Sequence, residues 1–153
     1  MRTHFTEVLA RESVCLAGVT DGPKLAAWRH RMVRELMTPG SPYALALRQT
    51  GDAPERDDFL CRWRGLIAEA IDRLRRAGAI DGTNGPVSRA RSIDVDPQKT
   101  AVLILAALHG GNVLSHVAQD AWPLNTALDM ALAPFSTPEN AHSAYAGTER
   151  PDR

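Results

Sequence analysis

The chain has 153 residues, of which 44% are hydrophobic, enough for one globular domain with a buried core. Eighteen basic residues balance eighteen acidic ones, so the basic surplus that DNA-binding modules usually carry is missing. Two cysteines without zinc-type spacing exclude a disulfide framework and favour a reducing, cytoplasmic location.

The first half of the chain predicts four helices and no secretory signal. A helix is expected over residues 3–17. A second should end at residue 37, with Asp21 as its N-cap and Pro23 in its first turn. A short third helix over 43–49 has a weaker pattern. A fourth should start after a cap at Asp52, with Pro54 in its first turn. It carries arginines in its last turn and ends at Gly78.

The second half predicts two more helices between irregular segments. Residues 79–95 are rich in Gly, Ser and Arg without periodicity, which predicts a mobile surface loop. Asp96 and Pro97 repeat the cap-and-proline signature and start a helix that reaches about residue 119. Trp122 and Pro123 start the sixth. Residues 136–153 are polar and predict a disordered tail. Because no alternating strand pattern occurs, we expect one all-α domain over residues 1–135.

Two adjacent glycines interrupt the fifth predicted helix, which is apolar on every side over residues 101–108 and should therefore be covered on both sides. Ala107, Gly111 and Ser115 lie four residues apart and form a smooth ridge, with Gly110 beside it. A glycine costs roughly 1 kcal/mol relative to alanine inside a helix, so the pair indicates the close approach of another helix. Two interpretations stay open: close packing within one chain, or a symmetric dimer interface.

Several segments together resemble a known family. Residues 96–132, DPQKTAVLILAALHGGNVLSHVAQDAWPLNTALDMAL, resemble the last two helices of TetR-family transcriptional regulators. The earlier segments LAAWRHRMV, GSPYALALRQ and FLCRWRGLIAEAIDRLRRAGAI agree in order and spacing. Over residues 3–135 the chain is similar to the C-terminal ligand-binding and dimerisation domain of that family, in particular its LmrA/YxaF-like branch.

The resemblance implies that the last two helices pair with those of a second subunit in a four-helix bundle. Gly110, Gly111 and the helix that starts at Trp122 would then lie at or near the two-fold axis. The expected interface consists of Ala107, Gly110, Gly111, Ser115, Trp122 and Leu128.

The chain departs from the family at its N-terminus. Family members begin with a DNA-binding helix-turn-helix of roughly fifty residues, and nothing in this sequence resembles it. Three explanations stay open: a fragment of a longer protein, a start that was set too late, or a natural stand-alone sensor. By itself, the chain is not expected to bind operator DNA.

The resemblance also implies a cavity between the helices that binds an apolar small molecule. Residues of a suitable type, on helices that should converge, are Trp28, Met32, Tyr43, Phe59, Trp63, His109, Asn112 and His116. Each alone is more simply explained as core packing. Asn112 and His109 are the stronger candidates, because a polar group within an apolar helix needs a partner.

Other chemistry finds little support in the sequence. His109, His116 and Asp120 have a spacing that could hold a metal on a helix, but without further ligands hydrogen-bonded histidines are favoured. Cys61 lies among arginines that could activate a thiolate, although an ordinary buried cysteine is the simpler interpretation. Because nucleophile, Walker and dinucleotide-binding motifs are missing, neither an enzyme nor a cofactor is expected.

The sequence therefore predicts an effector-sensing and homodimerisation domain of a TetR-like regulator, without a membrane partner. An apolar ligand would shift the helices and change the spacing of DNA-binding heads that this chain lacks. The alternative is a head-less interaction module that pairs with a full-length relative and weakens its operator binding.

Overall fold

The computed structural model describes residues 4–48, 53–78 and 95–135. Within these ranges the chain forms six α-helices and one 3-10 turn, and no strand, which confirms the all-α class. The loop predicted at 79–95 lies outside the described residues except for Val95, which is buried, and the tail predicted at 136–153 lies wholly outside them.

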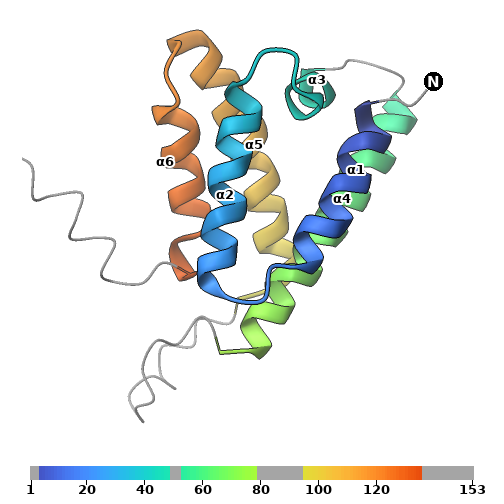
Figure 1. Cartoon of the computed structure of the whole chain (residues 1–153), viewed down its shortest axis with the longest axis vertical. Coiled ribbons are helices and arrows are strands. Elements are labelled where there is room, and N and C mark those ends of the chain that lie inside the picture. The colour runs from blue at the N-terminus through green and yellow to red at the C-terminus, as the bar shows by residue number, and fades with distance from the viewer. Residues whose placement is uncertain (1–3, 49–52, 79–94, 136–153) are drawn as a thin grey trace, which may run out of the picture.

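The helices form a bundle in which α5 is central. The elements in chain order are α1 (His4–Ala17), α2 (Gly22–Met37), α3 (Pro42–Arg48), α4 (Ala53–Arg76), α5 (Pro97–Ala118), α6 (Trp122–Ala131) and the 3-10 turn η2 (Ala133–Phe135). In Figure 1, α1 and α4 lie side by side on one side of the bundle, and α2, α5 and α6 form the other. α5 packs against both α6 and α4, so it joins the two sides.

The predicted helix boundaries follow from local hydrogen bonds. Asp21 Oδ1 accepts the Lys24 N–H at 2.9 Å and caps α2. Asp96 Oδ1 caps α5 in the same way, accepting the N–H of Gln98 at 2.9 Å. Gly78, two residues beyond α4, has a φ of 71°, a left-handed conformation that favours glycine. Both predicted caps and the glycine terminator are confirmed, whereas Asp52 lies outside the described residues.

The predicted apolar faces form one core. All five residues predicted for the inner face of α4 are buried: Phe59, Trp63, Ile67, Ala70 and Leu74. Aromatic contacts tie this face to α1, since the rings of Phe5 and Phe59 stack with their centroids 4.5 Å apart. The core thus fixes α1 on α4.

The two adjacent glycines of α5 have different surroundings. A Cβ at Gly111 would lie 2.9 Å from the Leu124 Cα and 3.5 Å from the Ala127 Cβ, both of which belong to α6. A Cβ at Gly110 would meet nothing within 4 Å. Gly111 therefore permits close packing within the chain, whereas Gly110 faces away from it.

Candidate functional site

A buried carboxylate on α1 accepts hydrogen bonds from three of the four aromatic residues that the sequence assigned to a ligand pocket. Glu12 is fully buried. Its Oε2 accepts the indole N–H groups of Trp28 at 2.9 Å and Trp63 at 3.2 Å. Its Oε1 accepts the Tyr43 hydroxyl at 2.7 Å and Arg31 Nη2 at 2.8 Å. Four donors from α2, α3 and α4 thus converge on one anion of α1.

Glu12 shifts the pKa values of two of its donors, Tyr43 and Arg31. Burial raises the pKa of Tyr43, and the nearby Glu12 carboxylate raises it further, so the phenol keeps its proton and donates it to Glu12. Burial lowers the pKa of Arg31, but the attraction of Glu12 and Tyr43 outweighs this effect, and the net shift is upward. Arg31 also places Nη1 2.9 Å from Cys15 Sγ.

The cluster is suited to holding helices together. A carboxylate has about four lone-pair positions, and the four donors at Glu12 occupy them. The single side-chain N–H or O–H group of Trp28, Tyr43 and Trp63 donates to Glu12. In this arrangement, none of these groups can donate to a ligand. The sequence analysis missed Glu12, although it stands at helical spacing between the apolar residues Val8 and Leu16.

The other two aromatic or apolar candidates from the first four helices are core residues. Met32 is fully buried, and Phe59 is buried against Phe5 and Trp63. Phe59 also lines a surface pocket between α1 and α4. The structure thus brings the five candidates of α2, α3 and α4 into the core.

The three polar candidates of α5 lie in different environments. His109 is exposed, His116 is half-buried and Asn112 is buried. His116 Nε2 lies 2.6 Å from Arg48 Nη2 and must accept this hydrogen bond, because a guanidinium group only donates. Asn112 Oδ1 has no hydrogen-bond partner among the described residues. Of the eight predicted ligand residues, Asn112 alone thus offers a buried polar atom that is not satisfied within the subunit.

The sequence also contains a possible metal-binding spacing and a cysteine among arginines. Across the described ranges, no group of three or more His, Cys, Asp and Glu side chains is arranged to hold a metal ion. Cys61 is exposed, with Arg64 Nη2 3.8 Å from its sulfur, so the interpretation of Cys61 as a buried cysteine is wrong. It lies on the outer side of α4, where helical neighbours do not cover it.

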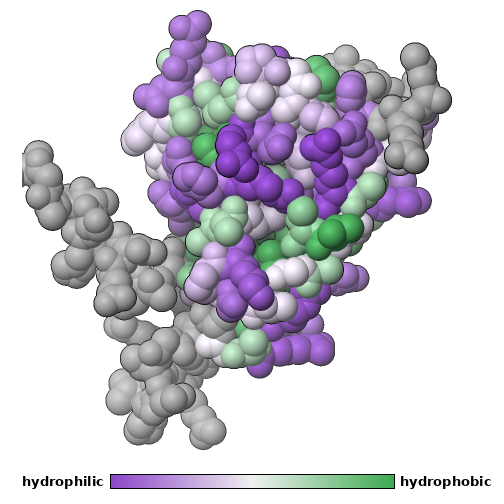
Figure 2. Space-filling model, viewed as in Figure 1, coloured by the Kyte–Doolittle hydropathy of each residue, from purple (hydrophilic) through white to green (hydrophobic). Residues whose placement is uncertain are grey.

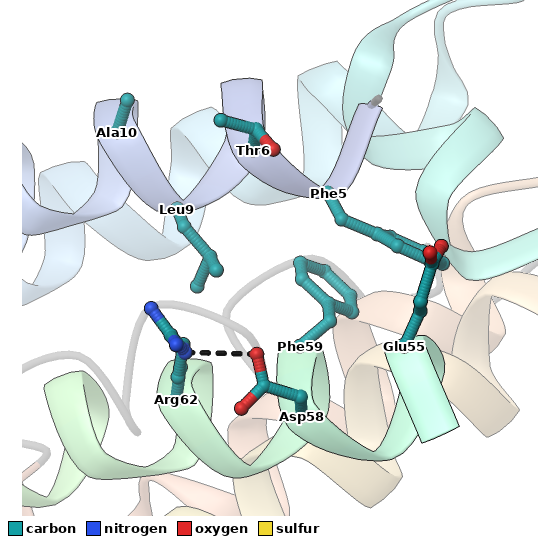
Figure 3. Close-up of a pocket in the computed structure, with 8 residues that line it drawn as sticks. All are labelled: Phe5, Thr6, Leu9, Ala10, Glu55, Asp58, Phe59 and Arg62. Carbon is teal, nitrogen blue, oxygen red and sulfur yellow. Dashed lines mark ion pairs between the residues drawn. The ribbon is translucent and has the colours of Figure 1, made fainter. Parts of the chain in front are cut away.

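A surface pocket of about 620 Å³ lies between α1 and α4 (Figure 3). Phe5, Leu9 and Phe59 form its apolar part, and Asp58 and Arg62 form an ion pair of 2.9 Å at its edge. Its remaining lining residues are Thr6, Ala10 and Glu55. Of the predicted ligand residues, only Phe59 contributes to this pocket, so it is not the cavity that the sequence analysis expected.

In the described part of the chain, a surface rich in exposed hydrophobic side chains is formed by α5 and α6. We call it the α5–α6 face, and its large hydrophobic members are Val102, Leu103, Val113, Leu114, Val117, Trp122 and Met130. Val117 is 81% exposed and Trp122 is 68% exposed. By contrast, Figure 2 shows hydrophilic side chains predominating on the face that carries α1 and α2. A single subunit therefore covers α5 on one side only.

The residues predicted for a dimer interface, on α5 and α6, divide into a buried group and an outward-facing group. Ala107, Gly111, Ser115 and Leu128 are buried within the subunit, so they are not available to a second one. The Ser115 hydroxyl accepts the backbone N–H of Leu124 at 3.0 Å, which joins α5 to α6. Gly110 and Trp122 lie toward the outside. The small-residue ridge is thus explained by packing within the chain.

By length and composition alone, α5 also meets the criterion for a membrane-spanning helix. The central helix of a globular bundle meets the same criterion, so this is weak evidence. In this structure, the buried side of α5 packs on α4 and α6.

Comparisons with protein-family models, curated proteins and solved structures gave no match to this chain. The structure itself shows an all-α bundle with a buried carboxylate cluster and one large uncovered apolar face.

Proposed function

We propose that this chain is a homodimerising regulatory domain of the TetR C-terminal type, which pairs through the α5–α6 face. One observation carries the proposal. Of the eight large hydrophobic side chains exposed in the described part of the chain, seven lie on α5 and α6. Exposed apolar side chains that gather on two packed helices mark interaction surfaces, because their exposure to water is unfavourable.

The composition of the face supports a protein partner. Between Thr100 and Gln119 the sequence contains no Asp, Glu, Lys or Arg. Trp122 and Met130 are residue types enriched in interface centres, where charged residues are depleted. A second copy presents the same uncharged surface, so a two-fold dimer buries both faces at once.

A membrane surface fits the face less well. Helices that lie in a lipid interface carry lysine and arginine along their polar side. On α5 the only such residue is Lys99, and the other side of the helix is buried in the bundle. The resemblance of residues 96–132 to the paired helices of TetR-family regulators adds to the case for a second subunit.

Two valines provide a matched test. Val117→Glu places a charge on the α5–α6 face, and Val14→Glu places one on α1, at positions 81% and 74% exposed. Both changes should leave the subunit folded, since neither side chain is in the core. We expect the wild type and Val14→Glu to be dimers by light scattering at micromolar concentration, and Val117→Glu to be a single subunit.

The proposal fails if the wild type is a single subunit, or if both variants dissociate equally. Sedimentation of the wild type with neutral phosphatidylcholine vesicles, lost in Val117→Glu and kept in Val14→Glu, would instead assign the face to lipid.

Asn112 favours a second role, effector sensing. Its unpartnered, buried Oδ1 is costly unless a donor reaches it, and a bound apolar molecule with one N–H or O–H group would supply that donor. In a complete regulator, such a ligand would favour one of two helix arrangements through its differential affinity.

A thermal-shift screen of apolar amides and alcohols tests this role. Asn112→Leu replaces the unpaired group by an apolar one of similar size, so the unliganded subunit should remain folded. Asn125→Leu is the control, because its amide donates to Ala121 O at 3.1 Å. We expect compounds that stabilise the wild type and Asn125→Leu but not Asn112→Leu. No stabilising compound, or an equal response of Asn112→Leu, would contradict this role.

A further inference from the structure

We infer that the two α5 helices of the dimer cross antiparallel beside Gly110, and that Lys99 of each subunit forms an ion pair with Asp120 of the partner subunit. This inference rests on the proposed dimer and adds the register and direction of its central contact.

Gly110 is the point on the α5–α6 face where another backbone can come closest. A Cβ there would meet nothing within 4 Å, so the space above it is open. Exposed apolar residues extend on both sides of it along α5, with Leu103 before and Val117 after. A helix that crosses at Gly110 therefore contacts apolar side chains in both directions.

An antiparallel crossing at this point matches large residues with small ones. A two-fold axis beside residue 110 places Leu114 opposite Ala106 of the other helix, and Leu103 opposite Val117. Ala106 is exposed, as are the three larger residues. A parallel arrangement would instead place Leu114 against Leu114 and Ala106 against Ala106. Interfaces fill space better when large side chains oppose small ones.

The charges at the two ends of α5 are complementary in the same register. Lys99 precedes Gly110 by 11 residues, about 16 Å at 1.5 Å per residue. Asp120 follows Gly110 by 10 residues and lies two residues beyond the end of α5. Both are exposed, and neither forms an ion pair with a residue in the described ranges. Asp120 Oδ1 accepts the Trp122 N–H, which leaves its second carboxylate oxygen for Lys99.

Helix dipoles favour the same direction. The N-terminus of each α5 carries a partial positive charge and its C-terminus a partial negative one. An antiparallel pair places opposite ends together, whereas a parallel pair places like ends together and brings Lys99 to Lys99. Charge and side-chain size thus agree on the antiparallel crossing.

Single-cysteine variants test the direction directly, in a Cys15→Ser, Cys61→Ser background that removes both native thiols. A disulfide needs Cα atoms within about 7 Å. In the antiparallel register, Gly110→Cys meets its own copy. Two copies of Val117→Cys are about 21 Å apart, since each lies seven residues from the axis. We expect mild oxidation to cross-link Gly110→Cys to its own copy. Val117→Cys should form a cross-link only when it is mixed with Leu103→Cys.

A different result is also informative. If light scattering shows a dimer and Val117→Cys cross-links to itself as fast as Gly110→Cys, the helices are parallel and this inference is wrong. If no dimer forms before oxidation, the proposed function fails as well. Mixing Ala106→Cys with Leu114→Cys repeats the test and leaves Gly110 unchanged. A dimer in which these two cysteines do not cross-link also contradicts the register.

Lys99→Met tests the ion pair. In the antiparallel dimer this change removes two attractive contacts, and we expect the dissociation constant to rise about tenfold. In a parallel dimer it would remove a repulsion and lower that constant. Lys24→Met is the control, because Lys24 is an exposed lysine on α2. An unchanged or lower dissociation constant for Lys99→Met contradicts the ion pair.

Discussion

Glu12 is a buried side chain whose hydrogen-bonding capacity is fully used. The carboxylate is buried, and each of its oxygens accepts two hydrogen bonds. A buried charge is costly when it loses a partner, since the remaining groups cannot reach water. The contribution of the cluster should therefore appear most clearly when Glu12 itself is changed.

Replacing Glu12 by glutamine should destabilise the fold by about 3 kcal/mol. One carboxylate oxygen becomes an NH₂ group that faces two donors, and Arg31 loses its charged partner. Glu7→Gln is the matched control on the same helix, because the Glu7–Arg11 pair is exposed and should contribute less than about 0.5 kcal/mol. Urea unfolding measures both values, and equal effects would contradict the role of the cluster.

Tyr43 gives this cluster a signature at high pH. Its pKa is raised above the ordinary value of 10.0 by burial and by Glu12, so the folded state holds the phenolic proton more tightly than the unfolded chain does. The resulting stabilisation is fully present below pH 10 and is lost as the pH rises further.

The Tyr145→Phe variant leaves Tyr43 as the single tyrosine of the chain. Its tyrosinate absorbance should appear only well above pH 10, together with loss of helical circular dichroism. Ionisation near pH 10 in a chain that stays folded would show that Tyr43 is not bonded to Glu12.

At the scale of the helix, the adjacent glycines of α5 form a natural pair for comparison. Gly111→Ala forces a Cβ to within 2.9 Å of the α6 backbone, and should cost about 2 kcal/mol. Gly110→Ala meets no atom of the subunit, and should stabilise the helix by up to about 1 kcal/mol.

Both glycine changes are best measured by urea unfolding in the Val117→Glu background, where subunit association does not contribute. Effects of the same sign would mean that α5 and α6 do not pack as closely as described.

Most helices could be predicted because their signals are local. Asp21 and Asp96 cap their helices through neighbouring backbone N–H groups, and the inner face of α4 follows a simple helical period. The Glu12 cluster could not be predicted, because its donors are 16 to 51 residues away along the chain. The sequence pattern also could not separate Gly110 from Gly111, since only the rotation of α5 decides which of them faces α6.

At the scale of the whole molecule, one side of α5 is buried in the bundle and the other side is exposed. α5 is covered by α4 and α6, yet Val102, Val113 and Val117 remain exposed. The sequence analysis expected this apolar helix to be covered on both sides, and a single subunit does not cover it. A second copy would bury the exposed side without any change in the arrangement of the helices.

Sedimentation equilibrium of the wild-type chain over the micromolar range tests this account most directly. We predict a mass twice the 16.6 kDa of one chain, which falls toward the single-subunit mass on dilution. A helical, cooperatively folded species of 16.6 kDa at every concentration would contradict it, because the α5–α6 face would then be stable in water without a partner.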